Sequence, residues 1–150
     1  MRRKPSYILI ESSRFTSDED RDQAMALFNA ILASCRQNAN ALETLHISVI
    51  IYGESPNQLY PLVSIVEDIR FPNLIEPGYG CMLGKTMRFL NRQIKSEVQP
   101  SSSTRKGDWL PSILLISSGN TDDAFDATTN RQKFAPVTVV GTSKSCINNL

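Results

Sequence analysis

The sequence has few of the residues from which metal centres, disulfide frameworks and hydrolytic triads are built. Its 150 residues include only three cysteines, which are widely spaced and form no Cys-x-x-Cys pair. Their odd number and spacing argue against a disulfide framework and a structural zinc site, and indicate reduced thiols. His46 is the only histidine, it lies in an apolar run, and no Gly-x-Ser-x-Gly turn occurs. We therefore expect a structural or surface histidine rather than a catalytic one.

An excess of charge of one sign and long hydrophobic runs are also lacking. Sixteen Lys and Arg residues stand against 15 Asp and Glu, so the chain has no overall field that would hold a nucleic acid. The apolar run behind Arg2, Arg3 and Lys4 extends only from Tyr7 to Ile10, too short for a signal peptide or a membrane span. We expect a cytoplasmic protein with no nucleic-acid or membrane partner.

Short apolar runs alternate with helical patterns along the chain. The runs that predict buried strands are residues 6–11, 45–53, 113–116 and 137–141, and residues 58–63 can return beside the second as a hairpin. Helical spacing occurs over residues 18–37, from Leu83 to near Pro100, and from Thr121 to about Lys133. This order predicts one α/β domain over residues 1–150, a doubly wound, mostly parallel sheet with helices on both faces.

Nine residues follow Gly141, too few for a full covering helix. We therefore expect a shortened C-terminus. Two interpretations stay open: a disordered stub, or a face of the last strands that is exposed or covered by a partner.

A glycine-rich turn and two single residues each allow two interpretations. Gly78, Gly80 and Gly84 precede a predicted helix, but Tyr79 occupies the position where a phosphate loop needs its first glycine. We interpret these glycines as tight-turn residues. Cys81 is either a buried small residue, which we favour, or a reactive thiol at a helix N-terminus. Trp109 is either a packed anchor, the usual role of tryptophan, or an interface residue.

Three segments carry a resemblance to a known family. They are Ala41-Leu42-Glu43-Thr44-Leu45-His46-Ile47-Ser48-Val49-Ile50, Gly80-Cys81-Met82-Leu83-Gly84, and Lys106-Gly107-Asp108-Trp109-Leu110-Pro111 followed by Thr121-Asp122-Asp123. They resemble the TerY group of von Willebrand factor A (vWA) proteins, which accompany bacterial tellurite-resistance and stress-response loci. The resemblance implies a Rossmann-like, six-stranded sheet with one antiparallel edge strand, and a metal-ion-dependent adhesion site at the carboxyl ends of the strands.

In the family that site uses an Asp-x-Ser-x-Ser loop, a Thr and a later Asp. The resemblance places these five ligands at Glu11, Ser13, Phe15, Cys81 and Ser117. Phe15 has no lone pair, the sulfur of Cys81 suits magnesium poorly, and Ser117 lacks the carboxylate charge that a small hard cation needs. We therefore predict a degenerate site with no metal and no cofactor.

Asp122 and Asp123 are the local candidates for a relocated metal site. The alternative, which we favour, is that both acids complement the dipole of a helix that begins after Thr121.

The rim around the degenerate site carries residue types that are common in protein interfaces. These rim residues are Ser12, Arg14, Phe15, Tyr79, Met82, Ser118 and Asn120. We expect partner binding there through Arg14, Phe15, Tyr79, Met82, Ser118 and Asn120, without a metal.

The leading functional hypothesis is a non-enzymatic adaptor or scaffold in a tellurite-resistance, stress or phage-defence system. The resemblance suggests kinase-like or phosphatase-like proteins and other Ter proteins as partners. The alternative is a metal-regulated vWA binding domain in which Glu11, Ser13, Ser117 and an Asp hold a divalent ion. A homodimer, or a heterodimer with a full-length relative, is a further hypothesis. An enzyme is not expected, because no base stands beside a nucleophile and no cofactor fingerprint occurs.

Overall fold

The computed structural model describes residues 1–13, 15–72, 79–123 and 137–141. Its elements follow the order β1 (Lys4–Glu11), α1 (Asp18–Arg36), α2 (Ala39–Thr44), β2 (Leu45–Tyr52), β3 (Pro56–Ser64), α3 (Leu83–Glu97), β4 (Ser112–Ser117) and β5 (Val137–Gly141). Every predicted strand is present. The predicted helix over residues 121–133 falls almost wholly outside the described residues.

The described strands form one mixed sheet in the order β3-β2-β1-β4-β5. β1 pairs in parallel with β2 and with β4, and β4 pairs in parallel with β5. β3 runs antiparallel to β2 at one edge, which confirms the α/β prediction with its antiparallel edge strand. The described residues contribute five strands, so the sixth strand that the resemblance implied is not among them.

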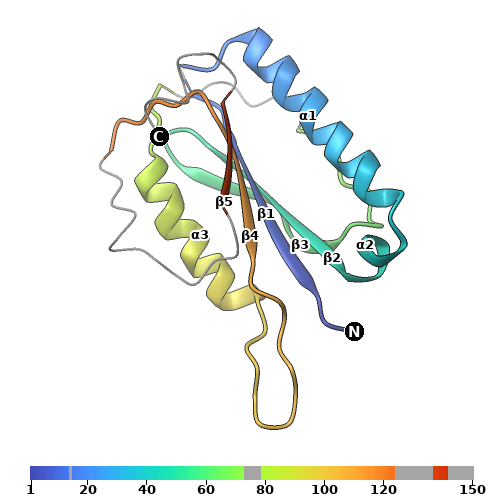
Figure 1. Ribbon diagram of the computed structural model, residues 1–150. Coiled ribbons are helices and arrows are strands. Elements are labelled where there is room, and N and C mark those ends of the chain that lie inside the picture. The colour runs from blue at the N-terminus through green and yellow to red at the C-terminus, as the bar shows by residue number, and fades with distance from the viewer. Residues whose placement is uncertain (14, 73–78, 124–136, 142–150) are drawn as a thin grey trace.

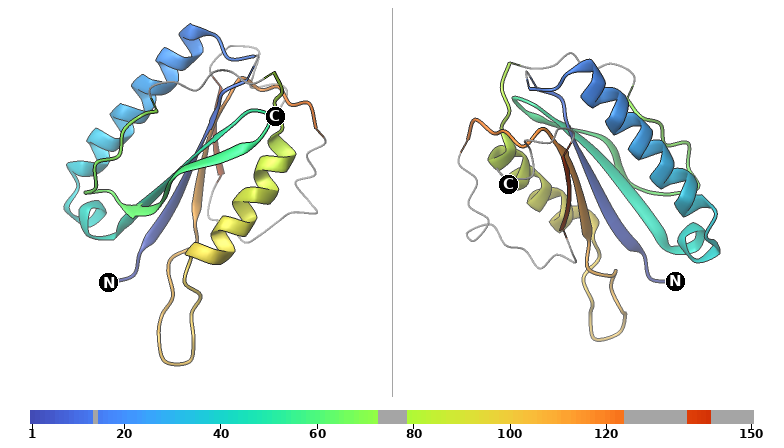
Figure 2. Two further views of the ribbon diagram at one scale, coloured as in Figure 1. Left: turned by 180° about the vertical axis from the view of Figure 1, so that it is seen from behind. Right: turned by 45° about the horizontal axis from the view of Figure 1, so that its top comes forward.

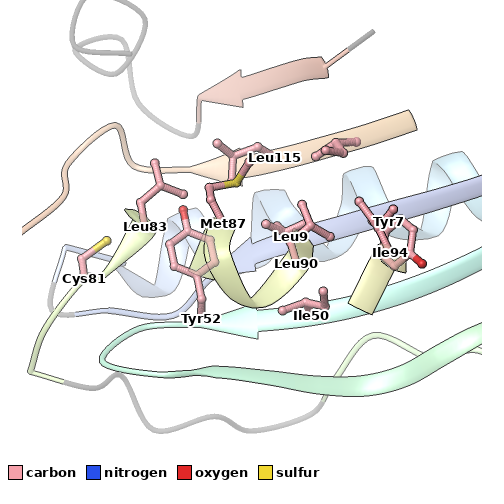
Figure 3. Packing of buried hydrophobic residues seen from close by; sticks show 11 residues of the cluster. Tyr7, Leu9, Ile50, Tyr52, Cys81, Leu83, Met87, Leu90, Ile94 and Leu115 are labelled. Carbon is pink, nitrogen blue, oxygen red and sulfur yellow. The ribbon is translucent and has the colours of Figure 1, made fainter. Parts of the chain in front are cut away.

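Each face of the sheet packs on one long helix (Figures 1 and 2). Side chains alternate along β1, so Ile8 and Ile10 join the cluster under α1 while Tyr7 and Leu9 join the cluster under α3. Figure 3 shows the second cluster, in which Leu90 from α3 lies over the central strands. Covering both faces explains why β1, β2 and β4 read as continuous apolar runs.

Local signals set the boundaries of α1 and α2. The Ser17 hydroxyl accepts a hydrogen bond from the backbone N–H of Asp20, and the Asp20 carboxylate accepts one from the N–H of Ser17, so a capping box starts α1. Asn38 caps α2 through the N–H of Ala41. Sequence analysis missed α2 because six residues are too few to show an amphipathic period. None of the described helices is long and apolar enough to cross a bilayer.

Candidate functional site

The site implied by the resemblance lies where the chain leaves the carboxyl ends of β1 and β4. From β1 the chain continues to β2 on one side, and it later returns to β4 on the other side of β1. The adjacent strands β1 and β4 therefore flank a topological switch point, where open α/β sheets usually bind ligands. Glu11 ends β1, Ser117 ends β4, and Cys81 lies two residues before α3. The fold thus brings distant positions to one place, as the resemblance implied.

The carboxylate of Glu11 is bound on both oxygens by donors of the protein. Oε1 accepts a hydrogen bond from the thiol of Cys81 at 2.9 Å. Oε2 accepts one from the backbone N–H of Ser118 at 2.9 Å and a longer one from the Thr16 hydroxyl at 3.4 Å. Glu11 is only 6% exposed. A buried carboxylate needs such donors, and here each of its two oxygens already has one at 2.9 Å.

Cys81 is a buried thiol. Its side chain is 0% exposed, and burial raises its pKa well above the usual range, an effect that the adjacent Glu11 carboxylate increases. The position just before α3 would favour a thiolate, but burial and the neighbouring negative charge outweigh it. The burial confirms the buried-residue interpretation, and both the burial and the raised pKa disfavour a reactive thiol.

The hydroxyl oxygens of both serines of the site accept hydrogen bonds from backbone N–H groups two residues further along the chain. Ser13 Oγ accepts from the backbone N–H of Phe15 at 3.2 Å, and Ser117 Oγ accepts from the N–H of Gly119 at 3.0 Å. Gly119 has φ 89°, a left-handed conformation that glycine adopts without steric cost. Phe15 is half-buried and packs against the cluster under α3, so it closes the site with a ring instead of offering a ligand.

Tyr52, at the end of β2, is a member of the site that sequence analysis missed. Its hydroxyl is buried and has no hydrogen bond of good geometry among the described residues. Burial raises its pKa well above the usual range, the Glu11 carboxylate raises it further, and the Ser117 hydroxyl opposes the shift. Only the apolar pattern of β2 marked this residue, and that pattern predicts a core position without revealing the polar tip.

This set of side chains does not fit magnesium. The ion prefers near-octahedral oxygen coordination with one or two carboxylates, and the one carboxylate here has protein donors on both oxygens. Within the described ranges, no group of three His, Cys, Asp or Glu side chains is placed to hold a metal ion. A cavity of about 30 Å³ beside Glu11 and Thr16 has room for about one or two water molecules, far less than a small organic ligand needs.

Asp122 and Asp123 cap the N-terminus of α3. The Asp122 carboxylate accepts from the backbone N–H of Cys81 at 2.8 Å. The Asp123 carboxylate accepts from the N–H groups of Gly84 and Lys85 at 2.8 and 2.7 Å. α3 has no side-chain cap of its own. The helix that we expected after Thr121 falls almost wholly outside the described residues. Within them, Asp123 binds two amides of the first turn of α3, and Asp122 binds the amide of Cys81 just before it.

The rim is narrower than the sequence suggested. Tyr79 is 86% exposed, and its backbone N–H donates to Glu54 Oε1. Asn120 is exposed, and Phe15 and Met82 are half-buried. Ser12 and Ser118 are buried, because the loops after β1 and β4 fold inward over Glu11, so their placement on an exposed rim is wrong. Arg14 lies outside the described residues.

Two other interpretations can now be judged. His46 is partly buried in β2, and its Nδ1 lies 3.1 Å from the carbonyl oxygen of Thr44, a structural contact. Trp109 is 50% exposed, with the guanidinium of Arg2 4.2 Å from its ring centroid. Trp109 is therefore not a core residue; it packs against Arg2, and the structure leaves its interface role open.

The glycine interpretation is wrong for Gly84, which is buried inside α3. Its N–H is bound by Asp123 rather than open to a phosphate. Gly80 does not have a positive φ, so it is not a turn residue that requires glycine for its backbone angles. Gly78 lies outside the described residues.

No protein-family model matches the sequence, and no match is found among curated proteins. Solved structures do match. The ArnB paralog VWA2 from Sulfolobus acidocaldarius aligns with a TM-score of 0.57 at 18% identity, over 93% of this chain and 34% of that one. BatB from Bacteroides thetaiotaomicron aligns with a TM-score of 0.60 at 15% identity, over 92% and 66%. The SpRpn10 VWA domain gives 0.51 at 12% identity, over 81% and 62%.

This chain thus spans from about a third to about two thirds of the length of these structures. At such low identities the similarity establishes the arrangement of the backbone alone. The protein therefore has the fold of a von Willebrand factor A domain.

Proposed function

We propose that this chain is a non-enzymatic protein-interaction domain that binds its partner at the carboxyl ends of β1 and β4 without a divalent ion. The vWA fold supports an interaction role in general. The observation that carries the metal independence is the state of Glu11, whose two carboxylate oxygens are bound by Cys81, Ser118 and Thr16. An ion would have to displace these donors, leaving a buried backbone N–H unsatisfied.

The narrowed rim supplies the contact surface of the proposal. Tyr79, Phe15, Met82 and Asn120 combine an exposed aromatic ring, two partly buried apolar side chains and a polar group. Aromatic residues and methionine are enriched at protein interfaces. An adaptor of the TerY type in a tellurite-resistance, stress or phage-defence system, with kinase-like or phosphatase-like proteins or other Ter proteins as partners, is the specific form that the sequence resemblance favours.

The absence of catalytic activity is part of the proposal. Burial raises the pKa values of the Cys81 thiol and the Tyr52 hydroxyl, so neither group supplies a nucleophile or base near neutral pH. The neighbouring cavity of about 30 Å³ is too small for an organic substrate.

The alternative is a metal-regulated binding domain in which Asp122 or Asp123 completes an ion site with Glu11. In this alternative, Asp122 would have to give up its hydrogen bond from the N–H of Cys81, or Asp123 those from the N–H groups of Gly84 and Lys85. We therefore favour the metal-free form.

Isothermal titration with magnesium and manganese distinguishes the metal-free domain from the metal-regulated one. We expect no binding heat with the native chain, and binding by a variant that carries Phe15→Ser, Cys81→Thr and Ser117→Asp. Circular dichroism checks that the variant is folded, and Ser117→Asp alone provides a milder second variant. Saturable binding by the native chain that is lost in Asp123→Asn would contradict the proposal.

The rim is tested with purified kinase-like and phosphatase-like candidate partners, in magnesium and in EDTA. We expect equal affinity in both buffers, and weaker binding by Tyr79→Ala than by the control Leu42→Ala, which changes an exposed residue of α2. Binding that disappears in EDTA would support the alternative.

A further inference from the structure

A second polar hollow lies at the amino ends of the parallel strands, at the opposite end of the sheet from Glu11. Its volume is about 420 Å³. Its lining includes Arg2, Arg3, Gln99, Arg105, Lys106 and Asp108. It forms where the start of β1 meets the long connection from α3 to β4, which projects beyond the sheet at the end where the N-terminus lies (Figures 1 and 2).

Hydrogen bonds hold the walls of this hollow. Arg3 binds both carboxylate oxygens of Asp108, at 3.1 and 2.6 Å, and donates to the carbonyl oxygen of Glu97 at 2.8 Å. Arg2 donates to the carbonyl oxygens of Gly107 and Asp108 at 2.7 and 3.3 Å. Arg2 and Arg3 are thus positioned before any ligand arrives, which lowers the entropic cost of binding at this wall.

The hollow is positively charged although the chain as a whole is nearly neutral. The single acid of the lining, Asp108, is neutralised by Arg3 and also accepts from the N–H of Gln99 at 2.8 Å. Arg2, Arg105 and Lys106 have no ion pair among the described residues. Three positive charges therefore face one hollow without a matching carboxylate, so the complementary ligand is an anion.

Two exposed apolar residues, Trp109 and Leu110, directly follow the lining residue Asp108 in the chain. The guanidinium of Arg2 lies 4.2 Å from the ring centroid of Trp109, which is 50% exposed, and the next residue, Leu110, is 58% exposed. Tryptophan and arginine dominate the energetics of protein interfaces. A free phosphate would use the charges alone, whereas a peptide with acidic and apolar residues would use both parts of this surface.

We propose that this hollow and the adjoining Trp109–Leu110 surface dock an acidic, leucine-containing segment of a partner protein. Carboxylates of the segment lie against Arg2, Arg105 and Lys106, and an apolar side chain packs on Trp109. This surface is separate from the rim around Phe15 and Tyr79, so its test is independent of the proposed function.

The test is fluorescence anisotropy with the whole chain and a short labelled peptide of glutamate and leucine. We expect saturable binding that weakens with added salt, as a charge-driven contact should. Arg105→Gln with Lys106→Gln should weaken it by about tenfold, since each exposed charge of an interface contributes roughly threefold. Trp109→Ala should weaken it by at least about fivefold.

The matched control is Arg92→Gln with Lys95→Gln, which removes the same charge from exposed positions of α3 outside the hollow. This control should keep the native affinity, and a peptide of lysine and leucine should not bind. No binding of the acidic peptide, or equal weakening in both double variants, would overturn the proposal. Full competition by inorganic phosphate, together with native affinity in Trp109→Ala, would assign the hollow to a simple anion and also overturn it.

Discussion

Removing the carboxylate of Asp123 should destabilise the domain by detaching the segment after β4 from α3. In Asp123→Ala the N–H groups of Gly84 and Lys85 and the hydroxyl of Thr121 lose an acceptor. Loss of a helix N-cap costs about 0.5–2 kcal/mol. Gly84 is buried whereas Lys85 is exposed, so water can replace only part of the loss. We therefore expect a decrease of about 1–2 kcal/mol in the free energy of unfolding.

The assay is urea unfolding monitored by circular dichroism, with thermal unfolding in parallel. For a chain of this size, this loss corresponds to a fall in Tm of roughly 2–8 °C. Asp123→Asn keeps one oxygen acceptor and should lose about half as much. The control is Asp22→Ala, which removes an exposed acid inside α1 and should change stability by less than about 0.5 kcal/mol.

The cost of Asp123→Ala should also depend on pH. Burial alone would raise the pKa of Asp123, but hydrogen bonds from Gly84, Lys85 and Thr121 and the charge of Arg88 outweigh it and lower the pKa. A folded-state pKa below the unfolded value of about 3.9 means that the stabilisation is complete above that pH and is lost as the pH falls through the folded-state pKa. The difference between wild type and Asp123→Ala should therefore shrink below about pH 4. An unfolding energy equal to that of Asp22→Ala at neutral pH would refute the capping role.

Two further predictions concern the same end of the sheet. In the folded protein Cys81 should resist alkylation by iodoacetamide at mildly alkaline pH while the partly exposed Cys35 reacts, because burial and then the Glu11 carboxylate raise the pKa of the Cys81 thiol. Peptide mapping measures the labelling of each cysteine, with denatured protein as the control. Equal labelling of the two cysteines in the folded protein would contradict the prediction. Gly53→Ala should lower the free energy of unfolding, measured in urea, by about 1–3 kcal/mol, because the added methyl group would collide with the backbone oxygen of Ser12. An unchanged free energy of unfolding would contradict this and show that the loop after β1 moves aside freely.

The elements that sequence analysis predicted well have a strong local or periodic signal. The capping box at Ser17 and the apolar period of residues 24–32 define α1, and the continuous apolar runs of β1 and β2 match strands covered on both faces. α2 lacked such a signal because it rests on the Asn38 cap and one helical turn. The family resemblance supplied the position of Glu11 beside Cys81, which no pattern of spacing would have indicated.

The errors and omissions concern residues whose role depends on segments far away in the chain. Sequence analysis did not reveal that the Asp123 carboxylate binds amides about forty positions earlier, because caps of this kind look identical in sequence whichever helix they serve. Ser12 and Ser118 looked like exposed loop residues, but two loops close over the Glu11 carboxylate and bury them. Nothing local in the sequence separates the packing role of Trp109 from an interface role, and only the structure shows that its ring is half exposed and lies against Arg2.

The sequence by itself determined the class of the fold, since alternation of apolar runs with amphipathic stretches is a property of neighbouring residues and dictates which faces must be buried. Through the family resemblance it also led to the prediction that ligands typical of a magnesium site are replaced by Phe15, Cys81 and Ser117. Only the tertiary structure decided what became of the remaining carboxylate, because a buried charge takes whichever donors the folded chain brings within about 3 Å. Those donors come from residues 16, 81 and 118, and their meeting at Glu11 is a consequence of packing rather than of spacing in the sequence.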